Sequence, residues 1–118
     1  MSLIPAHLKP LMISNARRRQ ADDSFDPFPI VKLFAPWAAA TWLLSELDPG
    51  DPDIAFGLCD LGHGFPELGS VRISELVNFK GQFGLGIERD LYFEAKAPLS
   101  RYAEAARQAG CIVEEVKP

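Results

Sequence analysis

The sequence has few of the residues that mark the common kinds of catalytic or metal site. Its only two cysteines, Cys59 and Cys111, are far apart and in no CxxC pair. This predicts neither a disulfide framework nor a zinc knuckle, and both thiols are expected to be small buried groups in a reducing compartment. The chain also has no GxSxG motif, no Walker lysine and serine pair and no Cys-His arrangement. No cofactor is therefore predicted.

Long hydrophobic runs are absent as well. No stretch approaches the length of a membrane span, and Pro5 and Pro10 interrupt the apolar N-terminal segment, whose charges follow it. A secretory signal has the opposite order, with its charges first. The sequence thus predicts a cytoplasmic protein with no membrane association. With 118 residues, 10 prolines and 9 glycines, the chain is expected to form a single domain with many turns.

Basic residues are missing from the central third of the chain. Between Leu33 and Val71 there is no lysine or arginine. The same stretch holds six acids: Glu46, Asp48, Asp51, Asp53, Asp60 and Glu67. With a formal net charge of −4, the chain has no general attraction for phosphate backbones, so nucleic-acid binding is not expected. The basic run 17–19 is interpreted as the solvated end of a helix.

The apolar pattern predicts an α+β fold. Period-two segments separated by short turns predict strands at 30–35, 40–47, 53–61 and 67–73, which would form an antiparallel meander. Further segments are expected as a fifth strand at 87–95, a short edge strand at 111–116, an N-terminal helix starting near Pro5 or Pro10, a short helix at 74–79 capped by Ser74, and a helix at 98–110. The prediction is a mostly antiparallel meander sheet of about five strands with N-terminal, short middle and C-terminal helices packed on one face.

The segment GQFGLG, residues 81–86, contains three glycines but does not fit a phosphate-binding loop. A dinucleotide fingerprint needs its glycines between a strand and the start of a helix, where free N-H groups hold the phosphate. Here the spacing is GxxGxG and the segment leads into a predicted strand. The glycines are therefore interpreted as a turn.

The strand after this turn places a cation among apolar side chains. Alternation puts Arg89 on the same side as Ile87, where its guanidinium needs a partner. Glu46, expected to share a strand face with Trp42, is a plausible partner. Two interpretations remain open: a structural buried ion pair, or an anion-binding arginine in a pocket beside Trp42.

A second candidate site lies around one loop, DLGHGFPE. Asp60, His63 and Glu67 flank it and would be able to converge on a metal ion of unknown identity or to act as acid and base. Their spacing matches no recognised ligand pattern, and a histidine in a glycine-rich loop is usually a solvated turn residue. Both interpretations stay open.

Several motifs in fixed order resemble one bacterial family. They are PIVKLFAP, TWLLSELDP, DIAFGLCDLGHGFPELGSV, SEL and GLGIERDLYF. Together they resemble the uncharacterised family called domain of unknown function 2958, from about Leu3 to Ala106. The resemblance implies a small cytoplasmic protein encoded on plasmids, integrative elements or other accessory DNA of bacteria. It supplies no activity and no site residue.

Two functions remain as hypotheses. The first is a non-enzymatic accessory protein that binds another protein through an acidic surface, favoured by the long stretch without bases. The second is a small metal-dependent or anion-binding hydrolase-like enzyme, with a site at Asp60, His63 and Glu67 or at Glu46 and Arg89. The lack of a dense polar cluster counts against the second. No pattern in the sequence predicts an oligomeric state.

Overall fold

The computed structural model describes residues 2–81 and 84–118. Its elements, in chain order, are η1 (Ala6–Leu8), α1 (Lys9–Ala21), β1 (Val31–Phe34), β2 (Thr41–Leu47), β3 (Ile54–Asp60), β4 (Glu67–Arg72), α2 (Ile73–Asn78), β5 (Glu88–Arg89) and α3 (Leu99–Ala109). The predicted α+β class is confirmed.

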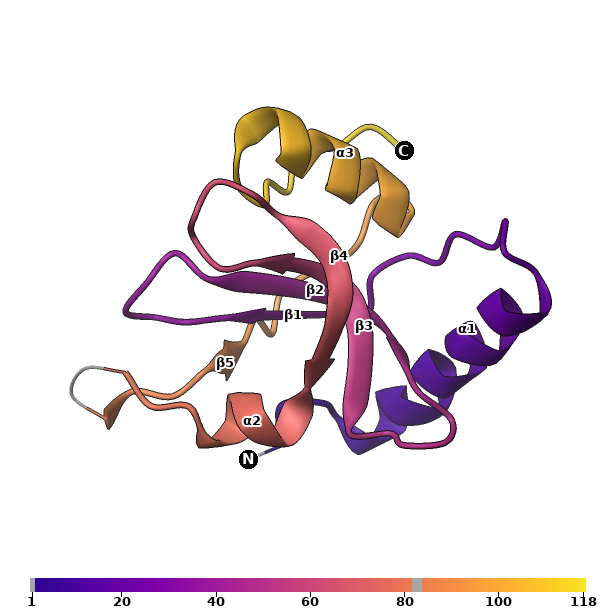
Figure 1. Cartoon of the computed structure of the whole chain (residues 1–118), viewed down its shortest axis with the longest axis horizontal. Coiled ribbons are helices and arrows are strands. Elements are labelled where there is room, and N and C mark those ends of the chain that lie inside the picture. The colour runs from indigo at the N-terminus through magenta and orange to yellow at the C-terminus, as the bar shows by residue number, and fades with distance from the viewer. Residues whose placement is uncertain (1, 82–83) are drawn as a thin grey trace.

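The five strands form one sheet in the order β4-β3-β2-β1-β5. Strands β1 to β4 pair with their sequence neighbours in antiparallel fashion, so the predicted meander is confirmed. Figure 1 shows the twisted sheet with α3 along one side, and with α2 and the N-terminus on the other. The prediction that the helices all pack on one face of the sheet is therefore wrong.

The fifth strand is much shorter than expected. Only two residues of β5 pair with β1, and Leu33 lies opposite Arg89. The Asp90 amide still donates to the Lys32 carbonyl, but the Asp90 carboxylate then accepts from the amide of Tyr92. This local turn ends the ladder, because an aspartate that bonds the amide two residues ahead bends the chain out of the strand.

The predicted C-terminal edge strand at 111–116 does not form in the described part of the chain. Instead, the Ile112 amide donates to the Asp60 carboxylate at 2.9 Å. The Glu114 carboxylate forms an ion pair with Lys32, with 2.6 Å between the two atoms. Individual side chains thus hold the segment in place of a backbone ladder.

A β-bulge at Ser45 divides β2 into two registers. Thr41 lies opposite Asp60, and an unbroken register would place Glu46 opposite Ala55. Glu46 instead lies opposite Phe56, because the register shifts by one residue between Leu44 and Glu46. Residues directly opposite each other point to the same face. The bulge therefore turns Glu46 away from the face that Leu44 occupies, although the two positions have the same parity.

Each face of the sheet has its own apolar cluster. On one face, Trp42, Leu44 and Ala55 pack with residues of the N-terminal segment and α1. On the other, Leu43 and Leu58 pack against α3. The burial of every residue of β2 except Thr41 follows from this coverage of both faces.

Helix α1 attaches to the bulge through its inner face. Met12, Asn15 and Ala16 are buried, and the Asn15 side chain donates to the carbonyl of Ser45 at 3.0 Å. One turn later, Arg19 forms an ion pair with Glu46 at 2.7 Å. The basic run 17–19 was predicted to be a solvated helix end. Arg18, however, lies over the ring of Phe25, so the run also makes contacts within the fold.

Helix α3 closely follows the prediction. Its buried residues are Leu99, Tyr102, Ala103 and Ala106, at helical spacing, and Gly110 ends it in the left-handed conformation with φ of 79°. At its start, the Asp26 carboxylate accepts hydrogen bonds from the amide and the hydroxyl of Ser100. This distant cap is not visible in the local sequence.

Helix α2 also has a distant cap, in place of the predicted local one. The Asp53 carboxylate, in the β2–β3 turn, accepts from the hydroxyl of Ser74 at 2.7 Å and from its amide at 3.0 Å. The hydroxyl hydrogen bond is the main cause of the lowered pKa of Asp53. Ser74 is therefore a donor inside the first turn, and Asp53 holds α2 beside the sheet.

At position 81, the start of the glycine segment, packing leaves no room for a side chain. The ring of Trp37 stacks on Phe79, with 5.6 Å between centroids, and also lies against Gly81. A Cβ at residue 81 would come within 2.2 Å of the Trp37 ring. Part of the predicted turn, residues 82–83, lies outside the described residues.

Candidate functional site

A large concave surface lies over Trp42. Three adjoining hollows, of 420, 390 and 400 Å³, share Trp42 and Leu61 in their walls. Trp42 pairs with Cys59, which in turn pairs with Glu67, so all three point to the same face of the sheet. We call this surface the Trp42 groove. Each hollow falls within the size range of known ligand sites, roughly 300–1,000 Å³.

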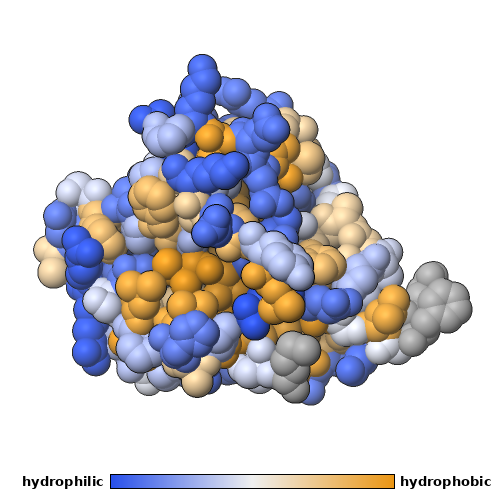
Figure 2. All heavy atoms as spheres, turned by 180° about the vertical axis from the view of Figure 1, so that it is seen from behind, coloured by the Kyte–Doolittle hydropathy of each residue, from blue (hydrophilic) through white to orange (hydrophobic). Residues whose placement is uncertain are grey.

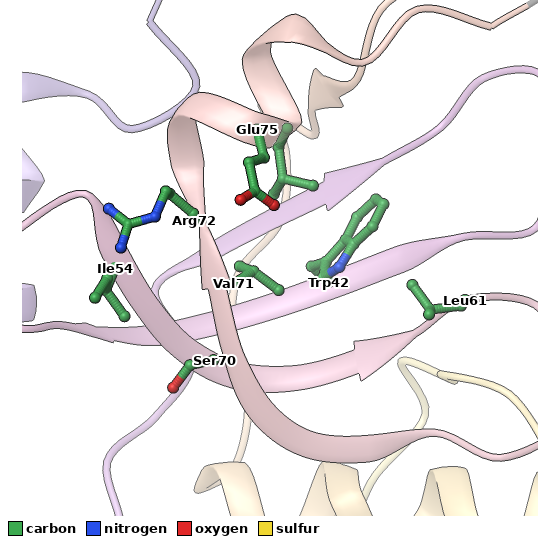
Figure 3. A pocket seen from close by; sticks show the side chains of 8 residues that line it. Trp42, Ile54, Leu61, Ser70, Val71, Arg72 and Glu75 are labelled. Carbon is green, nitrogen blue, oxygen red and sulfur yellow. The ribbon is translucent and has the colours of Figure 1, made fainter.

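The groove is built from three parts of the fold. Figure 3 shows Trp42 beside β4, with Val71 of β4 and Glu75 of α2 on one side of its ring and Leu61 on the other. A further part of the wall comes from the β1–β2 turn, where Trp37 lies beside Phe79. Since α2 is short, it covers only part of this face and leaves the sheet accessible between itself and the β3–β4 loop.

Apolar side chains at the rim face the solvent. Phe65, in the β3–β4 loop, is 81% exposed, and Leu61 and Phe79 are also exposed. Apolar residues also reach the surface on the reverse side of the molecule, so exposure alone does not single out the groove (Figure 2). The groove is distinguished by the combination of an apolar rim with a hollow, because such surfaces mark binding sites in monomeric proteins.

The polar groups of the groove are unequally satisfied. Arg72 is used within the chain, since its guanidinium contacts Asp51 at 3.2 Å and Asp53 at 3.3 Å. Glu67 and Glu75 have no cation within 4.0 Å among the described residues. The groove thus offers two carboxylates for which the described chain supplies no counter-charge.

The Trp42 indole carries a further unsatisfied group. The side chain is only 5% exposed, and its Nε1 has no acceptor among residues 2–81 and 84–118. A buried indole N-H without an acceptor is costly, and such donors usually have a partner. Trp42 lies in the wall common to the three hollows, but its Nε1 is itself buried.

Cys59 lines one of the hollows but is not a reactive thiol. Burial raises its pKa to about 11. At pH 8 only about one such thiol in a thousand is ionised, and the thiolate is the nucleophile. Cys111, by contrast, is exposed and Cys59 is half-buried, so the prediction of two buried cysteines is wrong for Cys111 and holds only in part for Cys59.

We therefore expect the two thiols to react with an alkylating reagent at very different rates. At pH 8, iodoacetamide should modify Cys111 within minutes and leave Cys59 unmodified in the folded protein, as read by mass spectrometry of tryptic peptides. Because the Cys59 pKa is raised, its rate should increase about tenfold per pH unit up to about pH 11. Urea-unfolded protein is the control, in which both thiols should react alike. Equal rates in the folded protein would contradict the burial of Cys59.

The structure separates the predicted triad of Asp60, His63 and Glu67. His63 and Glu67 both line one hollow of the groove. Asp60 is buried, its neighbour Cys59 points to the groove face, and its own carboxylate accepts from the amides of Gly62 at 2.8 Å and Ile112 at 2.9 Å. Across 2–81 and 84–118, no three His, Cys, Asp or Glu side chains are placed to hold a metal ion.

The second predicted pair is also not formed. Glu46 is the partner of Arg19, and the bulge at Ser45 turns it away from the face that holds Trp42. Arg89 is half-buried, and its Nε has no hydrogen-bond partner in the described part of the chain. Of these three candidates, only Trp42 belongs to the groove.

A family comparison covers almost the whole chain. Residues 3–113 match the family described as "Protein of unknown function (DUF2958)". The chain belongs to this family. No curated protein and no solved structure matches it. The family therefore confirms the resemblance noted in the sequence and leaves the function to be inferred from the groove. No helix in the described ranges is both long and apolar enough to cross a bilayer.

For this member of the family, sequence reasoning missed most of the groove. The overlooked wall residues are Trp37, Leu61, Phe65, Val71, Glu75 and Leu76. One signal was available: Leu61 and Phe65 are large apolar residues within a glycine-rich loop, where a solvated turn needs none. The remaining residues lie on separate elements that only the folded sheet brings together.

Proposed function

We propose that this protein is a non-enzymatic cytoplasmic accessory protein of bacterial mobile elements that binds another protein through the Trp42 groove. The observation that supports this best is the exposed apolar rim around a hollow floored by Trp42. Binding energy in protein interfaces concentrates where an apolar or aromatic anchor fills such a pocket. The occupant we propose is a protein segment with apolar anchors and basic side chains.

The charge of the groove favours a basic partner. Two of the six acids of the central stretch, Glu46 and Asp60, are buried, and Asp51 and Asp53 contact Arg72. The acid-rich stretch is therefore largely engaged within the fold. Glu67 and Glu75, which line the groove, are the acids available to a partner. The proposed binding surface is thus an apolar groove with an acidic rim and not a broad acidic face.

No observation favours the enzymatic alternative to the same degree. The Asp60 carboxylate is committed to two backbone amides, and Glu46 is committed to Arg19. A general acid or base must reach its substrate, and a buried carboxylate with both oxygens engaged does not. We therefore propose protein binding and not catalysis as the function of this chain.

Site-specific photocrosslinking tests this proposal with two matched positions. Phe65, at the groove rim, and Tyr92, outside the three hollows, are exposed aromatic residues, at 81% and 91%. Each is replaced in turn by p-benzoylphenylalanine, and the protein is irradiated in its native host. We expect a discrete crosslinked protein from position 65 and none from position 92.

A second variant makes the crosslinking specific to the groove. The change Leu61→Asp places a charge in the wall common to all three hollows and should abolish the crosslink from position 65. Because Leu61 is exposed in the folded protein, the change should alter stability by no more than about 0.5 kcal/mol. Identical products from positions 65 and 92, or no product from 65, would overturn the proposed function.

A further inference from the structure

Strand β4 is an open edge of the sheet. It pairs with β3 on one side only and stands at the end of the strand order. Charged side chains, a short length or a covering element normally protect such an edge. In Figure 1, β4 lies in front of the sheet, and no other described strand runs along its outer side. Its free backbone groups are therefore available to a further strand.

The register identifies these free groups. The Ile73 amide donates to the Asp53 carbonyl, which makes residues 53 and 73 a hydrogen-bonded pair. Such pairs alternate along an antiparallel ladder, so Val71, Gly69 and Glu67 also bond to β3. The N-H and C=O groups of Leu68 and Ser70 and the N-H of Arg72 point outward, whereas the Arg72 C=O begins the hydrogen bonding of α2. Outside helices and sheet ladders, none of these outward groups bonds to another residue in the described ranges.

Gly69 opens a notch between this edge and the groove. It lies between Glu67 and Val71 in the wall of the groove. A Cβ built at Gly69 would meet no atom within 4 Å, so the space above it is empty. A side chain from an added strand therefore has room to enter the groove at this position. A residue larger than glycine at position 69 would occupy this space.

Resting on the proposed function, we propose that the partner binds as an extended segment that adds a strand to the outer edge of β4. Its backbone pairs with the outward groups of Leu68 and Ser70 and with the N-H of Arg72. Its apolar side chains enter the groove beside Gly69, and its lysine or arginine side chains lie near Glu67 and Glu75. This is strand addition, in which backbone bonds give affinity and alternate side chains give specificity.

A second copy of the chain fits this edge less well. Because the outward groups belong to even-numbered residues, self-pairing of β4 would align even positions with even positions and odd with odd. Glu67 would then face Glu67, Gly69, Val71 or Ile73, none of which is basic. A different protein with basic residues supplies the counter-charge that self-pairing lacks.

One substitution blocks the edge without breaking the existing ladder. The Ser70 N-H points outward, so Ser70→Pro removes a donor that β3 does not use, and proline is tolerated at such edge positions. Ser70→Thr is the matched control, because it keeps the N-H. Gly69→Val fills the notch without meeting another atom of the chain within 4 Å of its Cβ. Circular dichroism and thermal melting should show that all three variants remain folded.

The probe is a phage library of random 12-residue peptides panned against the immobilised full chain. We expect enriched peptides in which apolar residues alternate with lysine or arginine. By isothermal titration, a synthetic copy should bind Ser70→Pro and Gly69→Val about tenfold or more weakly and Ser70→Thr unchanged. N-methylation of alternate peptide amides should have the same effect as Ser70→Pro, because it removes the same ladder bonds.

The outcomes separate this inference from the proposed function. No enriched peptide, or peptides that bind Ser70→Pro as tightly as the wild type, would overturn strand addition. If Ser70→Pro still yields the crosslink from position 65 in the native host, the groove binds a partner by another mode. Loss of the crosslink in Ser70→Pro but not in Ser70→Thr supports strand addition.

Discussion

Replacing Gly57 by alanine should abolish stable folding. A Cβ at this position would lie 2.0 Å from the carbonyl oxygen of Leu43 and 2.7 Å from the Cα of Leu44. These are backbone atoms of the adjacent strand, so no side-chain rotation relieves the overlap. Overpacking of a core usually costs about 1–3 kcal/mol, and a clash with the backbone at this distance should exceed that range.

The bulge explains why β2 comes so close to Gly57. Leu44, the last residue of β2 before the bulge, is the cross-strand partner of Gly57. A bulge increases the local twist and bends its strand, and here the bend fills the space above residue 57. Glycine in the middle of a buried strand normally weakens it, so its presence here marks a close backbone approach.

The cross-strand partner of Gly57 provides the control. Gly69 lies directly opposite on β4, and a Cβ there would meet nothing within 4 Å. The melting temperature should fall by about 10 °C or more in Gly57→Ala, if the variant folds at all, and by less than about 2 °C in Gly69→Ala. Equal effects at the two glycines would show that β2 does not approach β3 as described.

The second large effect is expected from Arg19→Met. Glu46 has a side chain that is only 3% exposed, and Arg19 is its partner at 2.7 Å. Removing one member of a buried ion pair costs about 3–5 kcal/mol, because the other charge stays buried. Since the Arg19 side chain is 43% exposed, water softens the loss, and we expect about 2–3 kcal/mol in the free energy of unfolding.

Urea denaturation of four proteins tests this expectation. Arg17→Met, on the exposed side of the same helix, controls for the loss of one positive charge and should change the unfolding free energy by less than about 0.5 kcal/mol. Arg19→Met with Glu46→Met removes both charges and should recover most of the stability, since an apolar pair can replace a buried ion pair. A double variant no more stable than Arg19→Met would show that the loss comes from packing of the arginine on Phe56.

The local patterns of the sequence predicted the four-strand meander well. Alternating apolar residues and the turn residues between them depend on neighbours in the chain, and both acted as expected in β1 to β4. Helix α3 was equally predictable, because its apolar stripe and Gly110 are local signals. The predicted fifth strand failed where Asp90 bonds the amide of Tyr92, a turn that alternation does not reveal.

The expected groupings of site residues are not formed, for a different reason. The pairing of Glu46 with Arg89 assumed an unbroken alternation along β2, and one extra residue at Ser45 reversed the side of Glu46. Asp60 and Glu67 are close in sequence, but they point to opposite faces of the hairpin. Closeness in the sequence therefore did not bring these two acids into one site.

The sequence by itself determined the α+β class, the meander, the family and the absence of common catalytic motifs, because these follow from local pattern and residue type. Only the tertiary structure decided where the charged side chains point and where the surface is hollow. A bulge of one residue, a short α2 that leaves Trp42 partly uncovered, and an edge strand with free amides all depend on contacts between distant segments. Such contacts arise from packing in three dimensions, and no local pattern carries them.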